Sequence, residues 1–157
     1  MSRWLAVLLT IAAIFWSIVI LTAPLGLRNA GTSSPSTLVY AAASRICHQR
    51  TERSFAVAGV QMPVCARCTG LYLSGAAGAL IAWYRRARGG GSSIRTMLFL
   101  AALPTAVTFS LEFAGIVAFS NTIRAVAALP LGAAAGWSFV QMLRYDARFD
   151  GNQIING

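Results

Sequence analysis

Four apolar blocks separated by polar or turn-forming residues run along this chain. They cover about residues 4–25, 69–84, 97–119 and 123–143. A helix that crosses the hydrocarbon core of a bilayer needs about 20 mostly apolar residues. The pattern therefore predicts an all-α membrane protein whose four transmembrane helices form one domain over residues 1–157.

The first apolar block begins in the manner of a signal peptide, with Arg3 just before it. Its apolar run is longer than the usual core of about 7–15 residues, and no small-x-small cleavage site follows directly. We therefore expect residues 4–25 to remain as a membrane helix.

The segment between the first two blocks, residues 26–68, is the only substantial extramembrane piece that the pattern leaves. Turn-forming residues fill positions 29–36, and a short helix toward Cys47 is expected after them. Residues 54–62 have the pattern of a small hairpin around Ala58 and Gly59. Such a hairpin would fold the later cysteines back toward Cys47.

Small residues recur every four positions in two of the apolar blocks. These are Gly70, Ser74 and Gly78 in the second block, and Ala128, Gly132 and Gly136 in the fourth. In lipid, where packing drives helix association, small residues let two backbones approach closely. The sequence thus predicts that each of these two helices packs closely against a neighbouring helix through its small-residue face.

Composition supports a membrane location. The chain is 57% hydrophobic and 11% charged, against about 25% charged residues in soluble domains. Its net charge of +9 comes from arginine alone, and the arginines lie mainly at the ends of the apolar blocks, where they anchor helices. No basic stripe with interleaved aromatic residues exists. We expect contact with the lipid bilayer and none with nucleic acid.

The orientation rests on the linker between the second and third blocks. Residues 85–91 are short and rich in arginine, as cytoplasmic loops are. This places the segment 26–68 on the extracytoplasmic side of a bacterial inner (plasma) membrane.

All three cysteines and the only histidine fall inside the extramembrane segment, at Cys47, His48, Cys65 and Cys68. Cysteine and histidine ligate zinc and iron, and a Cys-x-x-Cys at a helix start brings two sulfurs to one ion. Adjacent residues do not easily face one ion, so His48 is either the fourth ligand or a residue that orients a ligand. In the second case Glu52 or water would complete the sphere.

The same residues permit two other interpretations. Cys65 and Cys68 could exchange thiol and disulfide states, with Arg67 and a helix N-terminus favouring the thiolate, and Cys47 as the resolving thiol. Quinone-linked thiol oxidases are small helical bundles with this arrangement, which is an analogy at the level of fold. Alternatively, the pair forms a structural disulfide and leaves one spare thiol.

Glu112 is the only acidic residue within an apolar block. Ionisable groups in a membrane are costly and are usually paired or functional. Arg124, at the start of the fourth block, is the expected partner. Glu112 is thus a candidate catalytic residue beside Cys65 and Cys68, and Arg67 and Arg124 are candidates for binding a cofactor or headgroup.

The residues from Cys47-His48-Gln49 to Pro63-Val64-Cys65-Ala66-Arg67-Cys68-Thr69-Gly70 resemble the signature of a family of small bacterial membrane proteins, domain of unknown function 2085. The resemblance continues more loosely through residues 121–124 and the Gly132 and Gly136 run. It implies a polytopic membrane protein but supplies no reaction. The family often has an Asp in the third helix, where this chain has Thr108, with Glu112 nearby.

The sequence therefore predicts a membrane protein with a metal site at Cys47, His48, Cys65 and Cys68, filled by zinc or iron. Two alternatives stay open. One is a membrane thiol–disulfide oxidoreductase that uses Cys65 and Cys68. The other is a non-catalytic subunit of a membrane complex, with a protein partner or a second copy of the chain.

Overall fold

The computed structural model describes residues 2–30, 35–84 and 91–155. Its long helices are α1 (Ser2–Ala30), α3 (Ala66–Tyr84), α4 (Gly91–Phe113) and α5 (Asn121–Ile155). A short helix α2 (Ser36–Ala43), a 3-10 turn η2 (Thr51–Arg53) and a hairpin of β1 (Ala56–Val57) and β2 (Val60–Gln61) lie between α1 and α3. The expected combination of a helical bundle with a short helix and a hairpin is confirmed.

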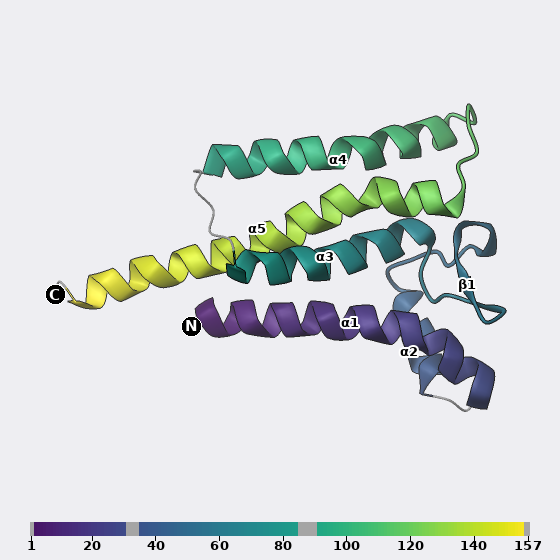
Figure 1. The fold of residues 1–157 in the computed structure, drawn as a ribbon, viewed down its shortest axis with the longest axis horizontal. Helices are drawn as coiled ribbons and strands as arrows, with labels where there is room; N and C mark the ends of the chain where they lie inside the picture. The colour runs from purple at the N-terminus through teal and green to yellow at the C-terminus, as the bar shows by residue number, and fades with distance from the viewer. Residues whose placement is uncertain (1, 31–34, 85–90, 156–157) are drawn as a thin grey trace.

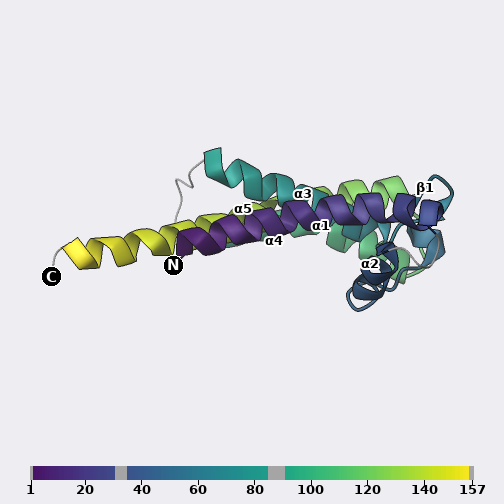
Figure 2. The same cartoon turned by 90° about the horizontal axis from the view of Figure 1, so that it is seen from below.

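The long helices lie side by side in the order α4, α5, α3, α1; the neighbours α3 and α5 run in the same direction, and α1 and α4 run in the opposite one (Figure 1). The segment with α2 and the hairpin covers one end of the bundle, and both ends of the chain lie at the other (Figures 1 and 2). The arginine-rich residues 85–90, on which the orientation was predicted, lie outside the described residues.

Three of the described helices are long and apolar enough to cross a membrane, at Arg3–Asn29, Ile94–Phe113 and Asn121–Arg144. Four membrane helices were predicted, and three of them are supported. The fourth, α3, is less apolar than the other long helices. Its sequence is rich in Gly and Ala, and most of its residues are buried or half-buried beside α1 and α5. A helix enclosed by others needs little apolar surface of its own.

The predicted close packing through small residues is present, and the structure shows that α3 and α5 are the two helices that meet. A Cβ atom added to Gly70 would overlap the carbonyl oxygen of Ala125, and one added to Gly78 would overlap that of Ala133. A Cβ on Gly132 would meet the Ser74 hydroxyl. The two backbones touch, which only residues without a side chain permit.

Two helix boundaries differ from the sequence expectation in ways that matter for the site. α3 begins at Ala66 rather than near residue 69, so Cys68 lies in its first turn. α4 ends at Phe113 rather than near residue 119, and Gly115 follows with a φ of 71°, which suits a residue that ends a helix. Glu112 therefore lies in the last turn of α4.

Candidate metal centre

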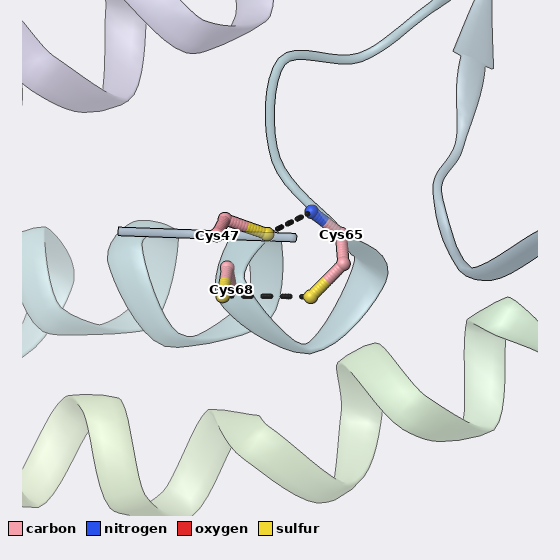
Figure 3. Close-up of side chains that lie close together, drawn as sticks. All are labelled: Cys47, Cys65 and Cys68. Carbon is pink, nitrogen blue, oxygen red and sulfur yellow. Dashed lines mark hydrogen bonds between the residues drawn. The ribbon is translucent and has the colours of Figure 1, made fainter. Parts of the chain in front are cut away.

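The three cysteine sulfurs converge at the end of the bundle that carries α2 and the hairpin (Figure 3). All lie within 4.8 Å of one another, and the sulfurs of Cys65 and Cys68 are 3.4 Å apart. Cys47 is buried, Cys65 and Cys68 are half-buried, and none of the three is in a disulfide. The convergence that the hairpin was expected to produce is thus present.

Cys65 immediately precedes α3, where the helix has unpaired backbone N–H groups. A hydrogen bond with Cys68 is the largest influence that lowers the pKa of the Cys65 thiol, to about 5. Burial opposes it, while the backbone N–H groups of Cys68 and Arg67 and the Cys47 side chain add to the lowering. One cysteine of the cluster is thereby favoured as a thiolate, the form that binds metals.

Arg67 contributes to this effect differently from the sequence expectation. Its backbone N–H group is the part that contributes to lowering the pKa of the Cys65 thiol. Its guanidinium instead reaches α4, where Nη2 lies 2.5 Å from Oε2 of Glu112. The helix places Arg67 between two sulfur-bearing positions but directs its charge to the neighbouring helix.

Two glutamines hold the loop that carries Cys47, and sequence reasoning gave them no role. The Gln49 side-chain amide donates to the carbonyls of Tyr40 and Pro63, at 2.9 and 2.8 Å. Gln61 Nε2 donates to the Gln49 carbonyl at 2.6 Å. These bonds join α2, the loop and β2. The only sequence signal for them was the position of both glutamines within the motif.

His48 is exposed and is not part of the sulfur cluster in the described structure. Gln49, the next residue, has a φ of 48°, a conformation rare outside glycine. The loop thus changes direction directly after Cys47 and His48. The hypothesis that His48 is a metal ligand stays a prediction.

The hairpin that precedes the second cysteine pair turns at Ala58 and Gly59, with φ angles of 52° and 82°. Two consecutive positive φ angles are typical of the tight turn that matches the twist of paired strands. Val57 pairs with Val60 and Ala56 with Gln61. The chain is thereby returned to Pro63 and Cys65, beside Cys47.

Glu112 and Arg124 form the predicted ion pair, with Arg124 Nη2 2.6 Å from Oε1 of Glu112. Thr108, one turn earlier on α4, donates its hydroxyl within its own helix, to the carbonyls of Pro104 and Thr105. Glu112 is therefore the acidic residue that α4 presents beside the cysteine segment.

The fold and the cluster together describe a helical membrane protein with a thiol site at one end of its bundle. The family model described as "Predicted membrane protein (DUF2085)" matches residues 47–138. This chain belongs to that family, as its Cys-His-Gln and Cys-x-x-Cys motifs suggested.

Two archaeal proteins, both described as uncharacterized, are similar to the chain. One, from Methanothermobacter thermautotrophicus, is 32% identical over 55% of this chain and 78% of its own length. The other, from Methanocaldococcus jannaschii, is 33% identical over 57% of this chain and 58% of its own length. These relatives are archaeal, so they leave the expectation of a bacterial protein unsupported. No solved structure matches the chain.

Proposed function

We propose that this membrane protein binds one zinc or iron ion through Cys47, Cys65 and Cys68. The observation that carries the proposal is the convergence of three sulfurs, from two segments of the chain, within 4.8 Å. Zinc–sulfur bonds of about 2.3 Å in tetrahedral geometry place two sulfurs about 3.8 Å apart. The separation of 3.4 Å between Cys65 and Cys68 and the limit of 4.8 Å bracket this value.

The fourth coordination position decides what such a site does. Structural zinc sites use four protein ligands, whereas catalytic sites leave one position for water or substrate. In the described structure no fourth Cys, His, Asp or Glu joins the cluster. We propose that an external ligand takes this position, and that His48 competes for it only if its loop reorients.

The test is metal analysis with free-thiol counting on detergent-purified protein. Wild type and Cys65→Ser are compared, with Ser44→Ala as the control because the Ser44 hydroxyl is exposed and bonds within its own turn. The proposal expects about one zinc or iron per chain in wild type and Ser44→Ala, and its loss in Cys65→Ser. No metal in wild type overturns it.

A thiol–disulfide function is the second candidate, favoured by the contact between Cys65 and Cys68 and by the lowered pKa of Cys65. It predicts a different result in the same experiment: no metal and one free thiol of three. Its redox partner would then be sought by measuring the reduction potential. A subunit role would instead appear as a protein that stays bound through purification.

We also propose that α3 crosses the bilayer beside the three apolar helices, with the cysteine site on the extracytoplasmic side of the plasma membrane. The direction of the long helices reverses from each to the next along the chain, from α1 to α3, α4 and α5, and this supports the proposal (Figure 1). Reporters fused after Tyr84 and after Gly157 should then both lie in the cytoplasm. Reporters on opposite sides would contradict the proposal.

A further inference from the structure

One carboxylate and two arginines are buried beside the cysteine site. The side chains of Glu112, Arg67 and Arg124 are 6%, 15% and 10% exposed. They come from three different helices, α4, α3 and α5. Each Glu112 oxygen is taken by a different arginine, Oε2 by Arg67 and Oε1 by Arg124.

The ion pair between Glu112 and Arg67 connects this carboxylate to the Cys-x-x-Cys motif. Arg67 lies between Cys65 and Cys68, and its guanidinium also lies over the Phe109 ring of α4, 5.6 Å from the centroid. The Arg67 Nε atom is buried without a hydrogen-bond partner among the described residues. The charge of this guanidinium is balanced by Glu112, through the ion pair of its Nη2 atom. Because the contact fixes Arg67, it also fixes the rotation of the helical turn that presents Cys68.

The ion pair between Glu112 and Arg124 connects the same carboxylate to the segment that follows Cys47. Arg124 Nη1 donates to the Glu52 carbonyl at 3.3 Å and to Oδ1 of Asn121 at 2.7 Å. Asn121 Nδ2 in turn donates to the Ser54 carbonyl at 3.0 Å. Both parts of the cysteine site are therefore linked to the same carboxylate, through different arginines.

The net charges of the two neighbouring groups also favour a link between them. The carboxylate and the two guanidiniums sum to +1. Three thiolates around a divalent ion sum to −1. Opposite net charges in neighbouring sites of low dielectric attract each other, whereas an isolated buried charge is costly.

We propose that Glu112 is a positioning residue for the metal site, and that it holds Cys47 and the Cys-x-x-Cys in register through Arg124 and Arg67. The proposal rests on the metal-binding function proposed above and adds a residue distant in sequence from every cysteine. Residues that orient metal ligands typically change affinity by about 10- to 100-fold when mutated. That is the size of effect expected here.

The experiment measures zinc affinity by competition with a chromophoric chelator and records the absorption spectrum of the Co²⁺-loaded protein. The variants are Glu112→Gln, which removes the charge, Glu112→Asp, which shortens the side chain, and Arg67→Met, which leaves the Glu112–Arg124 pair intact. Thr108→Ala is the matched control, one turn away on α4 with a hydroxyl that donates within its own helix.

Helical content and the unfolding midpoint of the metal-free protein are measured on the same samples. A merely structural role would lower the midpoint but leave zinc affinity and the Co²⁺ spectrum of the folded protein unchanged. The proposal expects zinc affinity about 10- to 100-fold weaker in Glu112→Gln and Arg67→Met, with shifted Co²⁺ bands. It also expects partial recovery in Glu112→Asp and no change in Thr108→Ala.

Wild-type affinity and spectrum in both Glu112→Gln and Arg67→Met would overturn the positioning role while leaving the metal site in place. If Glu112→Gln does not fold, Arg67→Met alone decides, because a neutral ion pair remains in it. If the wild type binds no metal, the proposed function fails first and the positioning role falls with it.

Discussion

The backbone N–H of Cys65 donates a hydrogen bond to the sulfur of Cys47 at 3.2 Å, although the two residues are 18 positions apart (Figure 3). This bond joins the loop after α2 to the start of α3. The Cys47 sulfur is thus positioned beside the other two by the backbone itself. The three sulfurs are therefore held together by the fold itself, as the proposed metal site requires.

Replacing Cys47 should remove far more metal affinity than replacing its neighbour His48. Cys47→Ser deletes a sulfur of the cluster and the acceptor of the Cys65 N–H bond, so we expect a loss of more than about 100-fold, beyond the range typical of residues outside the ligand shell. His48→Ala removes an exposed side chain outside the cluster, and we expect a loss of less than about 10-fold. Chelator competition measures both.

A large loss in His48→Ala, equal to that in Cys47→Ser, would identify His48 as the fourth ligand. The loop would then have to turn on metal binding, because the described conformation keeps the imidazole outside the sulfur cluster.

In the metal-free protein, Cys65 should be the first thiol to be alkylated under mildly acidic conditions. Its pKa is lowered to about 5, chiefly by the hydrogen bond with Cys68, and the thiolate is the reactive form. Because the pKa is lowered, the thiolate persists above about pH 5 and alkylation slows as the pH falls through that value. Labelled iodoacetamide with peptide mapping at several pH values measures this.

Cys68→Ala provides the control for the cause of the lowered pKa. Without the Cys68 hydrogen bond, the pKa of Cys65 should rise toward its ordinary value, and the alkylation profile should shift to higher pH. An unchanged profile would mean that the backbone N–H groups at the start of α3 and the Cys47 side chain are sufficient to favour the thiolate.

The sequence was sufficient to predict the parts of this structure that depend on local pattern. Apolar blocks predicted the long helices, the four-residue spacing of Gly78 and its neighbours predicted close helix packing, and the Ala58–Gly59 turn predicted the hairpin. Glu112 and Arg124 could be paired because they lie at facing ends of consecutive helices. Each of these inferences needed only periodicity and adjacency along the chain.

What the sequence left out depends on side-chain direction. Arg67 was expected to act on its neighbouring thiols, yet its guanidinium crosses to Glu112, because a helical position one residue from Cys68 faces a different direction. The sequence predicted α3 as a membrane span, but α3 is not among the three helices apolar enough to cross a membrane, since it is rich in Gly and Ala and packs against other helices. Enclosure by α1 and α5 cannot be deduced from its own composition.

The backbone contact between α3 and α5 predicts a strong asymmetry between two adjacent positions. Gly78→Leu would force a side chain into the Ala133 carbonyl, and we expect it to lower the free energy of unfolding in detergent by about 3 kcal/mol or more, at the upper end for overpacking. Ala77→Leu adds the same side chain at an exposed position and should change it by less than about 0.5 kcal/mol. Denaturant unfolding followed by circular dichroism compares the two, and equal effects would contradict the close approach.

Gln49 should support the metal site without touching the ion. Gln49→Ala removes both side-chain bonds, to the carbonyls of Tyr40 and Pro63, and leaves these acceptors to find water. The loop that carries Cys47 would then be held less firmly beside Cys65, and we expect metal affinity to fall by about 10-fold. Ala58→Gly serves as the control, because its exposed turn position has a φ of 52°, which glycine adopts freely, and its metal affinity should match wild type. Competition titrations on both variants measure the difference, and wild-type affinity in Gln49→Ala would show that the Cys47 loop is held by its backbone contacts alone.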